Sequence, residues 1–148
     1  MENKVIQIPA KNPEGVNGRM KVGHVGLRTT DYDATIKWYM EKLGFRLIKK
    51  WEVKDLKMAF LAPANDDDFF IEVLNGGITG SHQDPSQPII SGFQHICIEV
   101  GNVDDTLAVL RENDVKVLRE PFEVPAIGKR CGFIADLFGN VIELTENI

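Results

Sequence analysis

The chain has 148 residues and a mass of 16.6 kDa, which suits one compact domain. Its composition, 43% hydrophobic and 26% charged, is that of an ordinary globular protein, and no apolar run approaches the ~20 residues that span a bilayer. The net charge of -5 and the absence of a basic cluster argue against nucleic-acid and membrane partners. We therefore expect a small-molecule partner. We also expect a cytoplasmic location, because the N-terminus lacks the pattern of a signal peptide.

The first 20 residues contain prolines and glycines and predict an N-terminal arm, in which Val5–Ile8 is a candidate edge strand. A short β-branched stretch at 21–29 then predicts a strand. Asp31 is a candidate N-cap for a following helix, and Gly44 stands where a helix stop belongs. Three further extended stretches are predicted at 45–53, 57–62 and 68–74, with a turn at 65–68 before the last of them.

A similar series follows a glycine- and proline-containing stretch that predicts a linker at 76–91. It begins with a predicted strand at 93–100, and Asn102 is the candidate cap of the next helix. Extended stretches are predicted at 115–119, roughly 121–134 and 140–146. The domain plan is thus an arm at 1–20 followed by one domain at 21–148, made of module one (21–75), the linker and module two (92–148).

The two series are related by a constant offset, which indicates a duplicated unit. His24 corresponds to His95, and 95 minus 24 is 71. Glu72 corresponds to Glu143, and 143 minus 72 is again 71. The predicted fold class is therefore α+β, with two βαβββ modules packed about a pseudo-twofold axis. Such packing would bring the two histidines and the two glutamates together.

Each of these four residues taken alone is ordinary, but their duplicated placement favours a metal site. A histidine on an apolar strand is more often structural than functional. A glutamate within Val141–Leu144 is less ordinary, because an unpaired carboxylate in apolar surroundings is costly. Two imidazoles and two carboxylates suit one divalent ion of zinc, nickel, cobalt, manganese or iron, with open positions for substrate. We predict that the ligands are His24, Glu72, His95 and Glu143.

An ion with two open positions could chelate neighbouring oxygens of a substrate, polarise a carbonyl and stabilise an enediolate. A carboxylate beside it could then remove a proton from the carbon next to that carbonyl. Glu143 is the first candidate for this catalytic base and Glu72 the second, because the repeat makes them nearly equivalent.

These motifs resemble those of the vicinal oxygen chelate superfamily, which pairs βαβββ modules. The ligand pattern is similar to that of glyoxalase I, the lactoylglutathione lyases, whose metal ligands fall on the four residues named above. The resemblance implies a metal-dependent lyase or isomerase acting on a hemithioacetal. Arg28 matches a glutathione-contacting arginine of that family, whereas Gly76 stands where the family has a glutathione-binding asparagine.

Two other functions of the same fold stay open at this point. Gln94–Val100 resembles methylmalonyl-CoA epimerase, which implies a coenzyme A thioester as substrate. Members that sequester drugs are binding proteins without a metal or turnover, but such a pocket has no need of four ligands.

Three basic residues are candidates for substrate binding, namely Arg28, Lys129 and Arg130. Solvation and loop charge are the competing explanations. We also expect a homodimer, because paired modules complete their curved sheets either within one chain or with a partner's module. Both cysteines, Cys97 and Cys131, are expected to be reduced.

Overall fold

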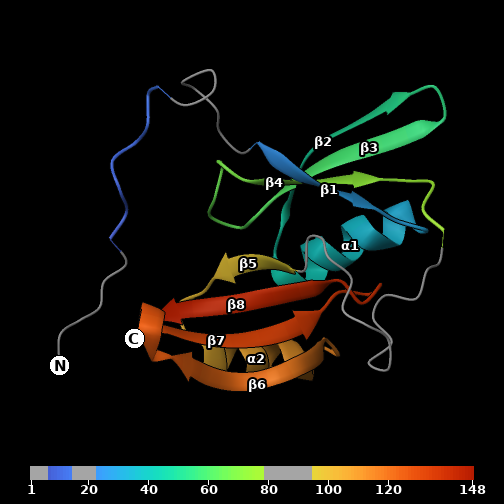
Figure 1. The fold of residues 1–148 in the computed structure, drawn as a ribbon. Coiled ribbons are helices and arrows are strands. Elements are labelled where there is room, and N and C mark those ends of the chain that lie inside the picture. Colours follow the sequence, from blue (N-terminus) through green and yellow to red (C-terminus); the bar gives the residue numbers. More distant parts are fainter. Residues whose placement is uncertain (1–6, 15–22, 79–94) are drawn as a thin grey trace. The chain divides into compact units, whose positions relative to one another are not determined.

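A computed structural model describes residues 7–14, 23–78 and 95–148 of the chain (Figure 1). Contacts divide these residues into two compact units, the first drawn from residues up to 78 and the second from residue 95 onward. Each unit contains one α-helix and one four-stranded sheet. The predicted α+β class with two βαβββ units is therefore confirmed.

The first unit forms a mixed sheet with the strand order β1-β4-β3-β2. Its first and last strands pair in parallel, and the remaining neighbours pair antiparallel. The parallel pair is possible because the helix and two strands separate these segments in the chain. The elements are β1 (His24–Arg28), α1 (Tyr32–Leu43), β2 (Arg46–Val53), β3 (Leu56–Ala62) and β4 (Phe70–Leu74).

The second unit repeats this topology with the order β5-β8-β7-β6, and again its first and last strands are parallel. Its elements are β5 (His95–Glu99), α2 (Val103–Glu112), β6 (Lys116–Val124), the short 3-10 helix η1 (Pro125–Ile127), β7 (Lys129–Ala135) and β8 (Val141–Asn147).

Both helices begin at the predicted caps. The Asp31 side chain accepts a hydrogen bond from the backbone N–H of Ala34 at 2.9 Å, and the Asn102 side chain accepts one from Asp105 at 2.8 Å. Each cap satisfies a backbone donor that the first turn leaves without an intrahelical partner. Gly44 ends α1 at φ 67°, a left-handed conformation that glycine adopts without a steric penalty.

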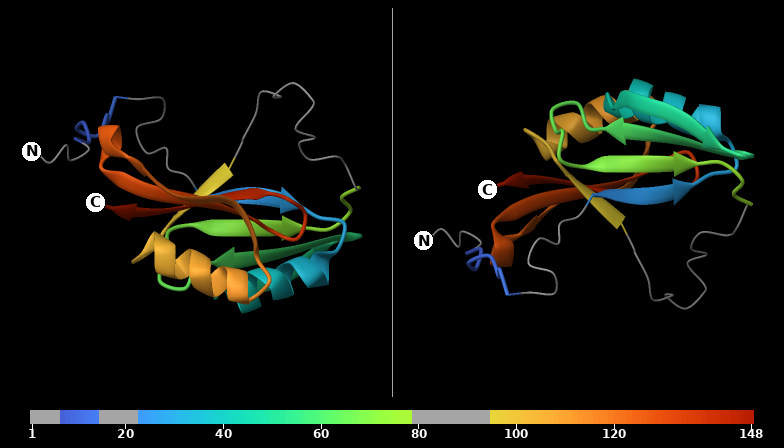
Figure 2. Two further views of the ribbon diagram at one scale, coloured as in Figure 1. Left: turned by 90° about the horizontal axis from the view of Figure 1, so that it is seen from below. Right: turned by 90° about the horizontal axis from the view of Figure 1, so that it is seen from above.

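One helix covers one face of the sheet in each unit (Figure 2). Strand alternation directs every second side chain to that face, and these side chains form the core. The opposite face carries the candidate metal ligands. The largest fully buried core side chains are Tyr39, Leu61, Ile71 and Val73 in the first unit, and Val103, Leu107, Ile134, Ile142 and Leu144 in the second.

The predicted strands at 115–119 and 121–134 require correction. A single strand, β6, runs through Pro121 to Val124, and η1 separates it from β7, which begins at Lys129. The ladder register shifts between Arg119 and Phe122, so the proline lies at an irregularity. Because β6 is the edge strand of its sheet, the missing N–H of the proline breaks no ladder on its open side.

Most of the predicted arm at 1–20 and most of the predicted linker at 76–91 lie outside the described residues. Of the candidate edge strand Val5–Ile8, the structure describes Gln7 and Ile8, and neither is part of a strand. None of the helices within 7–14, 23–78 and 95–148 is long and apolar enough to cross a membrane.

Candidate metal-binding site

The first unit brings His24 and Glu72 together. His24 begins β1, and Glu72 lies in the neighbouring strand β4 opposite Gly26, so both side chains project from the face away from α1. His24 Nε2 lies 3.3 Å from Glu72 Oε2. The Glu72 side chain is 17% exposed and the His24 side chain 43%, so the carboxylate lies deeper than the imidazole.

The second unit brings His95 and Glu143 together in the same way. Glu143 on β8 lies opposite Cys97, two residues beyond His95 on β5. His95 Nε2 and Glu143 Oε2 are 3.0 Å apart, with side chains 34% and 18% exposed. The repeated spacing in the sequence therefore corresponds to a repeated spatial pair.

The geometry of both pairs fits two ligands of one divalent ion. Ligand atoms that each lie ~2.1 Å from an ion are about 3.0 Å apart at octahedral angles and about 3.4 Å at tetrahedral angles. The two N–O distances of 3.3 and 3.0 Å fall in this range. Within the described residues no group of three or more His, Cys, Asp or Glu side chains is arranged to hold an ion.

An aromatic ring packs against each histidine, a feature that the sequence analysis missed. Phe60 lies 5.3 Å from the His24 ring and Phe133 lies 5.7 Å from the His95 ring, centroid to centroid. Phe60 is the β3 partner of Glu72, and Phe133 is the β7 partner of Glu143. Their separation is 133 minus 60, or 73, whereas the ligands are separated by 71. The constant offset of 71 therefore could not reveal the Phe60 and Phe133 pair. Aligning β3 with β7 by their strand pairing does reveal it.

The aromatic surroundings extend differently in the two units. In the first unit Phe60 also contacts Trp51 at 4.7 Å and Phe70 at 5.5 Å. In the second unit Phe122 stacks on Phe133 at 5.9 Å, and the Arg119 guanidinium lies 3.6 Å from the Phe122 ring centroid. Trp51 thus lies in the aromatic cluster beside His24.

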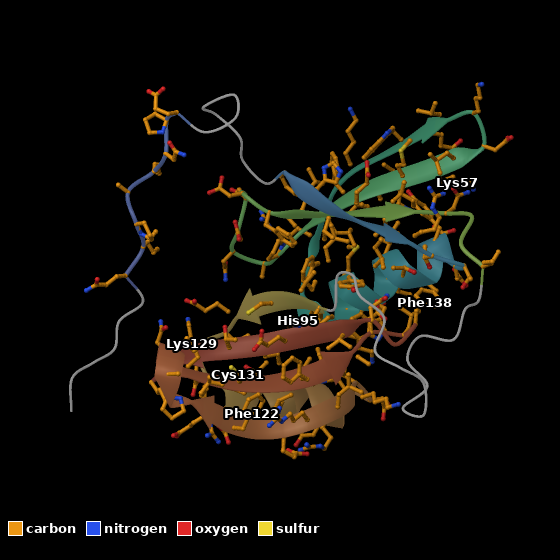
Figure 3. All side chains as sticks on the ribbon, viewed as in Figure 1. Lys57, His95, Phe122, Lys129, Cys131 and Phe138 are labelled. Carbon is orange, nitrogen blue, oxygen red and sulfur yellow. The ribbon has the colours of Figure 1, made fainter. Side chains whose placement is uncertain are left out.

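The three basic candidates differ in their placement. Arg28 lies on the same strand face as His24 and donates a hydrogen bond from Nη1 to the Asn75 carbonyl at 3.0 Å. Lys129 lies on the Glu143 face of the second sheet, 17% exposed, with Nζ 3.3 Å from Glu99 Oε2. Figure 3 shows Lys129 and Cys131 on β7 and His95 on β5.

Arg130 instead projects toward α2, because neighbouring strand residues face opposite sides of a sheet. Its guanidinium makes two hydrogen bonds to Asp104, at 2.5 and 2.8 Å, and Arg130 Nη1 lies 3.8 Å from Glu123 Oε1. The hydrogen bond to Asp104 raises the pKa of Arg130 and lowers that of Asp104. This arrangement connects β7 to α2 and does not bring Arg130 to the face that carries Glu143.

Both cysteines are free, as expected, and both lie beside Glu143. Burial, and then a hydrogen bond to the Glu143 carboxylate, raise the pKa of the Cys131 thiol to about 11. Burial also raises the pKa of Cys97, more than the Thr145 hydroxyl lowers it. Both thiols are therefore protonated near neutral pH and can act as hydrogen-bond donors.

Comparison with known proteins identifies curated relatives. A probable chloroplastic lactoylglutathione lyase of Arabidopsis thaliana is 33% identical over 132 residues, which are 88% of this chain and 37% of the relative. A lactoylglutathione lyase of Haemophilus influenzae is 29% identical over 133 residues, covering 86% of this chain and 93% of the relative. The chain spans less than half the length of the plant relatives, at 37%, 43% and 43%.

Solved structures with the same fold include two glyoxalase I enzymes. That of Zea mays has a TM-score of 0.65 and 29% identity, covering 84% of this chain and 44% of its own. The trypanothione-dependent glyoxalase I of Leishmania major has a TM-score of 0.64 and 27% identity, covering 85% and 86%. A family model matches residues 21–144, which contain both His–Glu pairs. With two βαβββ units and this match over most of its length, the chain belongs to the Glyoxalase/Bleomycin resistance protein/Dioxygenase superfamily.

Proposed function

We propose that the protein is a divalent-metal-dependent lyase or isomerase of the glyoxalase type. The observation that carries the proposal is the duplicated pair, in which a histidine nitrogen and a glutamate oxygen lie 3.3 Å apart in one unit and 3.0 Å apart in the other. In this proposal His24, Glu72, His95 and Glu143 hold one ion, from both units of one chain or from two chains. A pocket that only sequesters a ligand has no need of this donor set.

The proposed reaction moves a proton between carbons that carry neighbouring oxygens. A bound divalent ion would polarise the substrate carbonyl and stabilise negative charge as it develops. Either Glu143 or Glu72 removes the proton from the carbon next to the carbonyl and returns it to the adjacent carbon. The Glu72 and Glu143 side chains remain 17% and 18% exposed, so a proton held on either carboxylate can exchange with solvent before it is returned.

Two cationic side chains are suited to bind the anionic part of a substrate. Arg28 lies on the His24 face of its strand, and Lys129 lies on the Glu143 face of the second sheet. A hemithioacetal formed with glutathione is the first candidate substrate, because relatives carry the name lactoylglutathione lyase. A coenzyme A thioester is the second candidate, on the resemblance of the β5 segment to an epimerase.

The test begins with metal analysis of the purified protein. It continues with incubation of the metal-loaded protein in deuterated water with the methylglyoxal–glutathione hemithioacetal and, separately, with methylmalonyl-CoA. We expect deuterium next to a carbonyl in one product. Glu143→Gln and Glu72→Gln keep the size of the side chain but remove the proton acceptor, so loss of the base should lower turnover by ~10² or more.

The control is Glu112→Gln, which removes a carboxylate at the end of α2, outside the two pairs. It should retain most of the activity. Metal-loaded protein that is inert toward both substrates would contradict the proposed reaction. Undiminished metal content in a His95→Ala, Glu143→Ala double variant would contradict the proposed ligands.

A further inference from the structure

The two glutamates are equivalent in the repeat, but their neighbours differ in chemistry. In the first unit three of the positions that flank Glu72 on its sheet face are Gly26, Met58 and Leu74. In the second unit the corresponding positions around Glu143 are Cys97, Cys131 and Thr145. Three residues without a strong hydrogen-bond donor in their side chains are thus replaced by two thiols and a hydroxyl.

Strand pairing explains how these groups reach Glu143. Cys97 is its direct partner on β5, and Cys131 lies diagonally across on β7, opposite Thr145. Direct and diagonal neighbours on one face of a sheet are within side-chain reach. Both thiols therefore lie within side-chain reach of the Glu143 carboxylate, and Cys97 Sγ lies 3.5 Å from Thr145 Oγ1.

The direction of hydrogen bonds among these groups follows from the number of protons available. A thiol has one proton, and an ionised carboxylate can accept but not donate. If Cys97 donates to Glu143, the Thr145 hydroxyl must donate to the Cys97 sulfur. Such donation would form a chain from Thr145 through Cys97 to Glu143, with Cys131 as a second donor to the carboxylate.

Two of these three groups are buried, whereas Cys97 is exposed. Cys131 is 2% exposed and Thr145 is 6% exposed, so water does not compete for their protons. A buried polar group without a partner is costly, which favours conformations in which both donors keep their acceptor. Of the described side chains beside Glu72, the one that contacts its carboxylate within ion-pair distance is His24, which is the proposed fellow ligand.

We infer that Cys97 and Cys131 are positioning residues, which donate hydrogen bonds to Glu143 and so fix its carboxylate in the orientation needed to bind a metal ion. The inference rests on the proposed function, because it takes Glu143 as a ligand. Hydrogen bonds to ligating carboxylates orient the ligand before the ion arrives and typically contribute 10- to 100-fold to metal affinity. The corresponding neighbours of Glu72, which are Gly26, Met58 and Leu74, offer no thiol or hydroxyl donor, so the two carboxylates differ in how firmly they are held.

The experiment measures metal affinity rather than turnover. Zinc and cobalt binding is followed by competition with a chelating indicator for the wild type, Cys97→Ala, Cys131→Ala and the double alanine variant. We expect each single variant to lose about 10-fold in affinity and the double variant up to about 100-fold. The visible spectrum of the cobalt form should also change, because the ligand field depends on how Glu143 is oriented.

Serine replacements separate positioning from packing. Cys97→Ser and Cys131→Ser retain a hydrogen-bond donor, although serine exceeds alanine by only one oxygen atom. These variants should therefore bind metal within about threefold of the wild-type affinity. Gly26→Ala is the matched control in the first unit, where an added Cβ has ordinary contact with Leu74 at 3.5 Å. It should leave the affinity unchanged. Thermal unfolding of the metal-free variants checks that each one folds.

Crystal structures of the metal-free wild type and double alanine variant provide a readout that requires no ion. We expect one Glu143 conformer in the wild type and several in the variant. Wild-type affinity in the double alanine variant, or an equal loss in the serine variants, would overturn the inference while leaving the proposed function intact. Absence of metal binding in every form would reject the proposed function. In that case, an unchanged Glu143 conformer in the variant would overturn the positioning role as well.

Discussion

Gly77 illustrates how closely the chain packs just beyond β4. A Cβ at this position would lie 2.7 Å from the carbonyl carbon of Thr29 and 2.9 Å from its oxygen. Because these are backbone atoms, a side chain cannot rotate away to relieve the contact. The Gly77 N–H also donates to the Thr29 carbonyl at 2.8 Å, which holds the two segments at this distance.

We therefore predict that Gly77→Ala lowers the free energy of unfolding by about 1–3 kcal/mol, as expected for overpacking. Urea denaturation followed by circular dichroism measures this change. Gly101→Ala is the control, since a Cβ at Gly101 has nothing within 4 Å and should shift the stability by less than ~0.5 kcal/mol. Equal stability of the two variants would show that the Gly77 backbone can move.

At the scale of elements, the α1 cap gives a second prediction. Replacing Asp31 with alanine removes the acceptor for the Ala34 N–H, so Asp31→Ala should lower the free energy of unfolding by about 1 kcal/mol. Asp33→Ala removes the same charge from the same turn but no cap, and its effect should stay below ~0.5 kcal/mol. Chemical denaturation measures both, and a larger effect at Asp33 would mean that charge rather than capping governs this helix end.

The connections on either side of β7 differ in length from those on either side of β3. Lys54 and Asp55 join β2 to β3, whereas β6 and β7 are joined by Pro125–Ile127 and Gly128. The longer connection adds two residues before β7, and the shorter connection from Ala135 to Val141 removes two before β8. The ligands therefore keep their offset of 71 although the strand between them is displaced by two residues.

At the scale of the whole molecule, we predict a homodimer with twofold symmetry. Sedimentation equilibrium at micromolar concentration should give twice the chain mass of 16.6 kDa. The physical reason is that each βαβββ unit has a partly exposed sheet face that a second unit of the same kind can cover. A clean monomer at this concentration would contradict the prediction.

Mixed dimers would then show which units supply one ion. His24→Ala and His95→Ala chains each lack one ligand, so neither alone should hold metal at wild-type affinity. If the two pairs of one site come from different chains, a mixed dimer regains one site with all four ligands. Recovery of one ion per mixed dimer would establish this sharing, and no recovery would place both pairs of a site in one chain.

The helix ends and the His–Glu pairs of each unit could be predicted from the sequence. Asp31, Asn102 and Gly44 act through backbone groups only a few residues away, so their cap and stop roles are confirmed by the structure. The His–Glu pairs were also predictable, because duplication preserves equivalent positions and strand alternation fixes the face on which a side chain lies. These features depend on short-range geometry, which repeats wherever the pattern repeats.

The surroundings of those pairs were decided by the tertiary structure. Phe133 and Cys131 reach Glu143, and Arg130 turns toward Asp104, because of the register that β7 adopts after a connection of different length. Pro121 stays within β6 because that strand lies at the edge of its sheet. Register and edge position are set by pairing between distant segments, so the sequence by itself determined the two His–Glu pairs, and the folded sheet decided which side chains lie around them.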